Sequence, residues 1–401
     1  MKYPKIFEIH PELIKNGLSI FIICLIFFSI MPSLVEAKSA EEWFNKGINL
    51  GQSGKYEEEI KAYDEALKIN PQADKVWYNK GVALADLKRY EEANEAFEEA
   101  LKINPQDAVA WHNKGYALAE LKRYNESIEA YDEALKINPQ FAEAWNNKGN
   151  ALRSLERYNE SIEAYDEALK INPQNDYAWY NKGNALAELK RYDEAIKAYD
   201  EALKINPQFA NAWYGKGHAL ADLKRYDEAI KAYDEALKIN PQFAEAWNNK
   251  GVALQNLGRY DEAIKAHDEA LKINPQSASA WINKGNAFAE LKRYEEAIKA
   301  YDEALKINPQ EAGAWLSKGA ALYELKRYEE SIKASDEALK INPQHAEAWY
   351  NKGLALKNLG RKDEANEAFD KASKLQKAPG FEIIFAIAGL VMIAHLMRRR
   401  G

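Results

Sequence analysis

The sequence predicts an all-α solenoid built from ten two-helix units, each of about 34 residues. Its ten tryptophans recur at one constant interval, first at Trp43 and Trp77 and last at Trp349. Nine of its 13 prolines stand in an Asn-Pro-Gln triplet that recurs at the same spacing, from Pro71 to Pro343. Self-similarity at this period is typical of helical-hairpin repeats, whose units stack because none can bury its apolar face alone. Residues 38–378 are therefore predicted to form one array between two short terminal segments.

Each unit is predicted to contain a helix A and a helix B, over roughly positions 2–14 and 16–30 when Ala40 is counted as position 1. In the second unit Trp77, Gly81 and Leu84 recur at i, i+4 and i+7, which is one face of helix A. A second apolar stripe begins at Tyr90 on helix B. The Asn of each Asn-Pro-Gln triplet ends helix B, because a residue that precedes proline is disfavoured in the α region.

A family pattern accompanies this period. Trp43, Gly47, Tyr56, Tyr63 and Pro71 stand at positions 4, 8, 17, 24 and 32, which resembles the tetratricopeptide repeat over about residues 40–378. The resemblance implies a right-handed α-solenoid whose helices A line a concave groove for peptides or protein segments. One departure is systematic, because position 7, usually Leu in this family, is Lys in all ten units. A Lys stem can cover apolar surface while its ammonium stays in water, so we predict a structural role for it.

The composition excludes several classes of function. The formal net charge is −7, whereas a nucleic-acid-binding surface needs clustered Lys and Arg. The sequence has no phosphate-binding loop, no Cys or His pair at metal-ligand spacing and no nucleophile–base set outside the repeat framework. Acidic pairs such as Asp200-Glu201 recur in nearly every unit, which indicates a solvated face of helix B. We therefore predict a non-enzymatic protein with no catalytic residue, cofactor, metal site or nucleic-acid partner.

Residues 1–37 have the layout of a secretory signal peptide. Three lysines precede an apolar run over residues 18–30, and small residues precede a cleavage site after Ala37. The alternative is an uncleaved anchor helix, for which the run is short because spanning needs ~20 apolar residues. The one cysteine, Cys24, lies in this segment, so the processed chain would contain none.

Residues 379–401 have the three parts of a sorting signal. Pro379, Gly380 and Phe381 precede an apolar run over residues 383–396, and three arginines follow it over residues 398–400. This order resembles the PGF-CTERM signal of archaeal surface proteins, which implies processing and attachment of a membrane lipid. The alternative is a plain C-terminal anchor helix. In both cases the basic ends stay cytoplasmic, so the repeats are expected to face outward from an archaeal envelope.

The candidate binding surface lies on helix A, where variable residues stand inside the constant frame. By resemblance to the family, positions 2, 5, 6, 9, 12 and 13 face the groove. An Asn side chain offers donors and an acceptor, so a row of them can hold an extended peptide backbone. The candidate ligand-binding residues, at positions 5, 6 and 9, are Tyr78, Asn79, His112, Asn113, Asn146, Asn147, Asn150, Tyr180, Asn181, Asn184, Tyr214, His218, Asn248, Asn249, Asn283 and Asn286. The alternative, which the sequence leaves open, is that the position-6 asparagines bond to helix ends or to neighbouring units.

Two N-glycosylation sequons occur at position 18 of adjacent units. Asn125 and Asn159 are the candidate acceptors, each followed two residues later by serine. The alternative is sequence drift, since Ser127 and Ser161 also replace the alanine usual at position 20.

The tenth unit carries polar residues where the inner units are apolar. Lys362, Asn366 and Ser373 stand at positions 17, 21 and 28. These positions would contact an eleventh unit, so we predict that the array ends here and that its last helix is a polar cap.

Together these features predict an exported, surface-anchored interaction scaffold that binds an extended peptide or protein segment. The ligand is not expected to be a free carboxylate, because the Lys at position 5 and Arg at position 6 of chaperone-binding relatives are absent. The alternative function is a structural component of the envelope that associates laterally with further copies. The membrane is reached through the C-terminal segment or its lipid.

Overall fold

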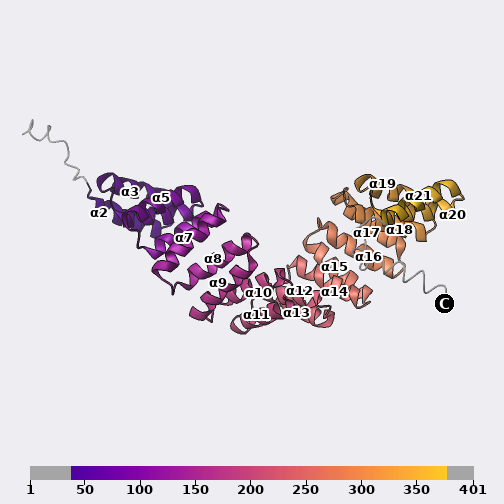
Figure 1. Ribbon diagram of the computed structural model, residues 1–401, viewed down its shortest axis with the longest axis horizontal. Coiled ribbons are helices and arrows are strands. Elements are labelled where there is room, and N and C mark those ends of the chain that lie inside the picture. The colour runs from indigo at the N-terminus through magenta and orange to yellow at the C-terminus, as the bar shows by residue number, and fades with distance from the viewer. Residues whose placement is uncertain (1–37, 377–401) are drawn as a thin grey trace, which may run out of the picture. The chain divides into compact units, whose positions relative to one another are not determined.

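The computed structural model describes residues 38–376, which form twenty helices and no strand (Figure 1). The chain divides into two compact units after Ala151, within α8, and each unit is described by itself. The first helices of the ten repeats are α2 (Ala40–Gln52), α4 (Asp74–Asp86), α6 (Ala108–Glu120), α8 (Ala142–Ser154), α10 (Asp176–Glu188), α12 (Ala210–Asp222), α14 (Ala244–Asn256), α16 (Ala278–Glu290), α18 (Ala312–Glu324) and α20 (Ala346–Asn358). The second helices are α3 (Tyr56–Ile69), α5 (Tyr90–Ile103), α7 (Tyr124–Ile137), α9 (Tyr158–Ile171), α11 (Tyr192–Ile205), α13 (Tyr226–Ile239), α15 (Tyr260–Ile273), α17 (Tyr294–Ile307), α19 (Tyr328–Ile341) and α21 (Lys362–Gln376).

The turns explain where the helices end. Helix A stops before a short turn whose middle residue, at position 15, has φ of 59° at Lys88 and 78° at Gly360. Backbone with positive φ is unfavourable for most residues, and repeats 1, 7 and 10 place glycine there. At the end of helix B the side chain of the Asn in the Asn-Pro-Gln triplet accepts a hydrogen bond from the backbone N–H of the Gln. In one example, Gln310 N donates to Asn308 Oδ1 at 3.1 Å. This Asx turn and the proline together end the helix.

The core of a repeat is a glycine of helix A against an aromatic ring of helix B. In repeat 8 a Cβ atom added at Gly285 would lie 2.5 Å from Cε1 of Tyr301, whose side chain is 1% exposed. The same close approach recurs between Gly47 and Tyr63 in repeat 1. Position 8 therefore has no room for a side chain, which accounts for a glycine inside a helix despite its cost of about 1 kcal/mol relative to alanine.

Consecutive repeats are joined by a recurring set of contacts around the tryptophan. Trp281 Nε1 donates to the backbone oxygen of Pro275 at 3.1 Å, so the ring holds the preceding turn. Lys284 Nζ lies 4.9 Å from the centre of the Trp281 ring and 2.6 Å from Asp268 Oδ1 of the preceding helix B. The structural role predicted for the position-7 lysine is therefore confirmed. The position-25 acid, predicted only to face solvent, pairs with this lysine between repeats.

The C-terminal end of the array is polar, as predicted. Asn366 and Ser373 of α21 are exposed, whereas Ile332 and Leu339, at the same positions of α19, are 8% and 7% exposed. The difference arises because Ile332 packs against residues of α20 and α21 and Leu339 against residues of α20, while no further repeat among the described residues covers α21.

Replacing Asn366 by Ile and Ser373 by Leu is expected to make the protein dimerise or aggregate. The two changes create an apolar face that an inner repeat would bury, and exposed contiguous apolar surface promotes association. Light scattering should show a larger species while circular dichroism shows unchanged helix content. The control variant carries Asn366→Gln and Ser373→Thr, and a monomeric Ile/Leu variant would contradict the capping role.

Two predictions concern residues outside the described range. These are the signal peptide with its cleavage site after Ala37 and the sorting signal that begins at Pro379. Within residues 38–376, no helix is both long and apolar enough to span a bilayer.

Candidate interaction surfaces

The predicted position-6 asparagines take part in hydrogen bonds between repeats. In the first unit Asn113 Nδ2 donates to the hydroxyl of Tyr78, 35 residues earlier, at 3.0 Å. Asn147 Nδ2 lies 3.0 Å from His112 Nε2 in the same way. Asn79 differs, since its Nδ2 donates to the backbone oxygen of Lys75 in its own helix at 2.7 Å.

The second unit repeats this arrangement. Asn249 Nδ2 donates to the Tyr214 hydroxyl at 3.0 Å, and Asn283 Nδ2 donates to Asn248 Oδ1 at 3.2 Å. The structure thus gives positions 5 and 6 a role between neighbouring repeats, which is the structural alternative that the sequence left open. Their predicted contact with a ligand stays a prediction. Four further predicted residues are half-buried, namely Asn146, Asn150, Tyr180 and Asn181.

The position-9 residues are of two kinds. Asn184 and Asn286 each accept a hydrogen bond from the hydroxyl of the position-24 tyrosine of their own repeat, at 2.8 Å. His218 is exposed, and its Nδ1 lies 3.4 Å from Oδ2 of Asp222, one turn further along α12. Of the predicted position-9 residues in the second unit, His218 is therefore the most accessible to a partner.

An aromatic cluster on the helix-A face joins the predicted Tyr180 to two residues that were not predicted, Tyr177 and Phe209. Tyr177, at position 2 of α10, is 62% exposed, and its ring centre lies 4.9 Å from that of Phe209. Phe209 also packs against Tyr180 at 4.9 Å. Tyr177 was not predicted because it does not recur between repeats; a tyrosine at position 2, found in repeat 5 alone, was the available signal.

Burial sets the protonation of the polar groups on this face. Desolvation raises the pKa of the Tyr78 and Tyr214 hydroxyls, so both remain neutral hydrogen-bond partners. Desolvation also lowers the pKa of His112, which favours a neutral ring beside Asn147. The exposed charges on the helix-A face of repeats 5 and 6 are the acids Glu188 and Asp222 at position 13.

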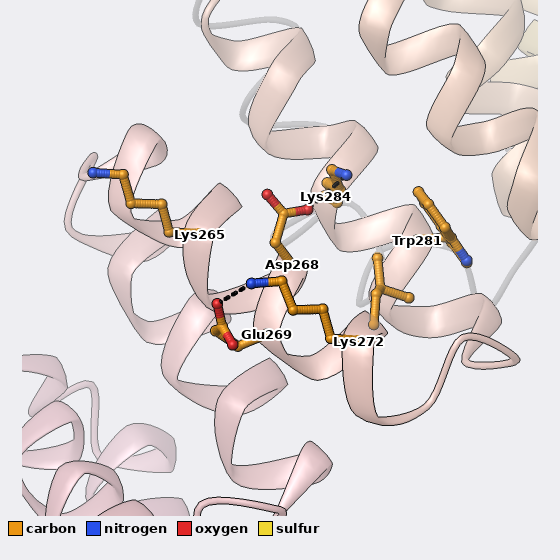
Figure 2. Close-up of a pocket in the computed structure, with 7 residues that line it drawn as sticks. Lys265, Asp268, Glu269, Lys272, Trp281 and Lys284 are labelled. Atoms are coloured by element: carbon orange, nitrogen blue, oxygen red, sulfur yellow. Dashed lines mark hydrogen bonds and ion pairs between the residues drawn. The ribbon is translucent and has the colours of Figure 1, made fainter.

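A row of hollows lies on another part of the second unit, between helix B of one repeat and helix A of the next. One of about 420 Å³ is lined by Lys265, Asp268, Glu269, Leu271, Lys272, Trp281 and Lys284 (Figure 2). Two more occupy the same place in the two preceding repeats, beside Trp213 and Trp247. None includes a predicted site residue. They arise because the tryptophan and two lysines stand around a leucine at position 28.

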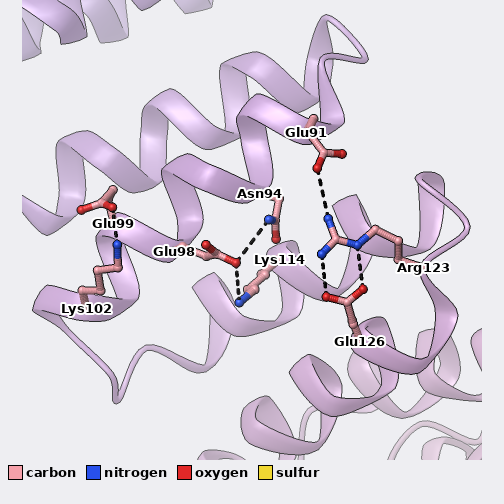
Figure 3. Close-up of polar contacts among 8 residues, drawn as sticks. All are labelled: Glu91, Asn94, Glu98, Glu99, Lys102, Lys114, Arg123 and Glu126. Carbon is pink, nitrogen blue, oxygen red and sulfur yellow. Dashed lines mark hydrogen bonds and ion pairs between the residues drawn. The ribbon is translucent and has the colours of Figure 1, made fainter.

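Ion pairs recur along the helix-B surface. Figure 3 shows Arg123 bound to Glu126 of its own repeat at 2.6 Å and to Glu91 of the preceding one at 3.1 Å. Lys114 pairs with Glu98 at 3.0 Å between the same two repeats. Such exposed pairs stabilise little individually, but the charges that they join are less available to a partner.

The two sequons present exposed asparagines and buried serines. Asn125 and Asn159 are exposed at the start of helix B, while Ser127 and Ser161 are 0% exposed. Ser127 Oγ donates to the backbone oxygen of Gly115 at 2.7 Å. Glycosylation of either asparagine stays a prediction. Within residues 38–376, no cluster of His, Cys, Asp and Glu is arranged to hold a metal ion.

Comparison with known families identifies the array. A model described as tetratricopeptide repeat matches nine overlapping segments between residues 44 and 380. The chain belongs to the tetratricopeptide repeat family. Tetratricopeptide repeats form protein-interaction scaffolds, a class that is typically non-enzymatic. In this tetratricopeptide repeat protein, residues 378–400 also match the PGF-CTERM motif, which indicates an archaeal protein anchored at the cell surface.

Solved structures of tetratricopeptide repeat proteins are similar to this chain. One from Parabacteroides merdae is 16% identical, covering 63% of this chain and 99% of its own with a TM-score of 0.48. YrrB, described as a TPR protein with an unusual peptide-binding site, is 26% identical, with coverage of 47% and 96% and a TM-score of 0.41. Yeast Tom70 is 14% identical, with coverage of 90% and 96% and a TM-score of 0.42. No curated protein sequence matches the chain.

Proposed function

We propose that this chain is an exported, cell-surface scaffold that binds extended peptide or protein segments along the helix-A face of its repeats. Residues 1–37 would be the signal peptide, residues 38–378 the binding array and residues 379–401 the sorting signal. The repeats would face the outside. Membership of an interaction family and the PGF-CTERM motif support the coarse assignment, and the distribution of unshared side chains supports the choice of face.

The observation that carries the choice of face is the exposed aromatic cluster around Phe209. The recurring residues of the frame, namely Trp, Lys, Gly and Tyr, have partners inside the array. Tyr177 is instead 62% exposed on one side of Phe209. Contacts between α10 and α12 bring the helix-A faces of repeats 5 and 6 side by side. An exposed ring on a fixed platform offers contact area at low entropic cost, as in many binding surfaces.

The charges beside this cluster favour an uncharged or basic segment. Glu188 and Asp222 are exposed at position 13 of α10 and α12, and His218 lies beside Asp222. A basic side chain could contact both the acids and the tyrosine face. These charges are exposed and screened over ~10 Å at 0.1 M salt, so affinity should fall only modestly as salt rises.

Photo-crosslinking at Tyr177 in native cells is expected to capture a polypeptide other than this chain. A photoreactive phenylalanine analogue at this position keeps the ring and reports what lies against it. The matched control places the same analogue at Gln242, an exposed residue of a repeat-end turn. Mass spectrometry of the adducts identifies the partner, and a second variant, Asp222→Asn, should weaken capture of a basic segment.

Equal labelling at both positions, or adducts only with this chain, would contradict the proposed face. The position-6 asparagines provide a further comparison. Asn249→Ala removes the hydrogen bond to Tyr214 and should lower thermal stability while capture at Tyr177 persists.

A further inference from the structure

Position 22 of helix B changes sign along the chain. Repeat 1 has the exposed Lys61 at this position, and repeat 10 has Glu367, which pairs with Lys371 at 2.7 Å. Between them, repeats 2, 3 and 4 have an exposed glutamate and repeats 5 to 9 have an exposed lysine. The glutamates are Glu95, Glu129 and Glu163, and the lysines are Lys197, Lys231, Lys265, Lys299 and Lys333. The flanking sequence is nearly constant, since α9 reads YNESIEAYDEALKI and α11 reads YDEAIKAYDEALKI.

These eight side chains differ from the neighbouring charged residues, which form ion pairs. In repeat 5 Glu194 pairs with Arg191, Asp200 with Lys216, and Glu201 with Lys204, all within 2.6 Å. Asp193, one turn before the position-22 lysine, lies 3.9 Å from Arg225 of the next repeat. Within residues 38–376, none of the eight position-22 side chains has an oppositely charged atom within 4.0 Å.

The lysines also border the row of hollows. Lys197, Lys231 and Lys265 each line one hollow, of about 390, 430 and 420 Å³, in three consecutive repeats of the second unit. In Figure 2 the Lys265 ammonium is not joined to either acid, while Lys272 is paired with Glu269. A carboxylate on a short aliphatic stem, placed against Leu271 and Trp281, would give the Lys265 ammonium an oppositely charged partner in this hollow.

We propose that these hollows receive the position-22 glutamates of a second copy of this chain. Glutamates and hollows both recur once per repeat, so contacts in consecutive repeats can form together. A second copy is favoured as the occupant because the same position supplies both signs of charge, at the same period, in one sequence. Glu95 and Glu129 of the first unit of one copy would enter neighbouring hollows in the second unit of another copy.

The strength of the contact suits chains that share a membrane. An exposed Lys–Glu pair is weak, so a few such pairs do not hold two freely diffusing molecules together. Anchoring in one membrane raises the effective concentration and makes weak side-by-side contacts sufficient. The proposal rests on surface anchoring in the cell, but its test does not, because the chain can be tethered artificially.

The test tethers full-length chains to nickel-lipid vesicles through a C-terminal His tag and measures energy transfer between donor-labelled and acceptor-labelled copies. The labels are placed at Gln72→Cys in a Cys24→Ser background. Wild-type copies should show more energy transfer than chains distributed at random at the same surface density. This excess transfer should fall on the order of tenfold when salt rises from low to molar concentration. Flotation of untagged chain with lipid tests anchoring separately.

Charge-reversal variants test whether a second copy of this chain occupies the hollows. A variant with Glu at all five lysine positions, and a variant with Lys at Glu95, Glu129 and Glu163, should each lose energy transfer alone and recover it when mixed. The control reverses Lys190, Lys224, Lys292 and Lys326 at position 15, where the sequence itself uses Glu156, and should behave as wild type. Circular dichroism confirms that all variants are folded.

Failure of the mixture to recover energy transfer, or equal transfer in wild type and both variants, would overturn the proposal. Polyglutamate is the competing probe. If it binds the lysine row of wild-type chains that remain apart, the surface takes an acidic polymer and a second copy is not its occupant.

Discussion

Replacing Gly285 by Ala is expected to destabilise repeat 8 by about 1–3 kcal/mol. The new methyl group would lie 2.5 Å from Cε1 of Tyr301, a ring that is 1% exposed and whose hydroxyl is bound to Asn286 at 2.8 Å. The ring cannot move without losing that bond or its packing. The loss should appear in thermal unfolding and as faster hydrogen exchange in α16 and α17, because stability in stacked repeats depends on neighbouring units.

The same substitution in the next repeat provides a matched control. At Gly319 the nearest atom to an added Cβ is Ser335 Oγ at 3.4 Å, an ordinary contact. Gly319→Ala should therefore be neutral, or stabilising by up to about 1 kcal/mol through helix propensity. Adding Tyr301→Ser to Gly285→Ala should recover part of the loss in a double-mutant cycle. Equal effects of the two alanines would contradict the steric explanation.

The stability of repeat 7 is expected to fall as pH drops from about 6.5 to about 4. His267 replaces the position-24 tyrosine and is 0% exposed; desolvation lowers its pKa from 6.5 to about 4. Between these values the unfolded chain binds the proton more readily, so acid favours unfolding. The free energy of unfolding therefore falls by about 3 kcal/mol as pH drops from 6.5 to the folded pKa of His267, and above pH 6.5 this loss is absent.

His267→Phe is the matched variant for this titration. Repeats 2 and 7 have a Gly-Val pair at the same positions of helix A. In repeat 2 this pair, Gly81-Val82, packs on Phe97, which is 1% exposed. The variant removes the proton site and leaves Asn248 Oδ1 without its contact to His267 Nδ1 at 3.1 Å. Urea unfolding followed by exchange in α14–α16 should show a smaller loss between pH 6.5 and 4 than in wild type. Parallel pH profiles would show that His267 is not the group responsible.

The fold could be predicted in detail because each signature residue has a contact that repeats. The constant spacing of Trp281 and its equivalents follows from the bond to the preceding Pro275 oxygen, and position 8 is glycine because of the ring beside it. The pairing of Lys284 with Asp268 could not be derived from spacing alone. It depends on how closely helix B of one repeat approaches helix A of the next, which a one-dimensional period does not specify.

The candidate surface was less predictable than the fold. Recurrence suggested that the position-6 asparagines form a ladder for a ligand, but the structure joins Asn113 to Tyr78 and Asn249 to Tyr214. A recurring residue is ambiguous, because packing between identical repeats also demands recurrence. Tyr177 and the position-22 charges differ between repeats, and neither is required by the frame. In an array of near-identical units, packing between repeats therefore does not account for a residue that varies at an exposed position.

The bond from each tryptophan to the proline of the preceding turn has a consequence for how such a gene can change length. The junction between repeats 7 and 8 is made by Pro275, Trp281, Lys284 and Asp268, and equivalent residues make the junctions on either side. Loss or duplication of one repeat length, wherever the breakpoint falls, would rejoin matching halves of the same junction. Recombination within the coding sequence could thus shorten or lengthen the array by whole repeats. The end cap on α21 would be kept, while the number of repeats available to a partner would change in whole steps.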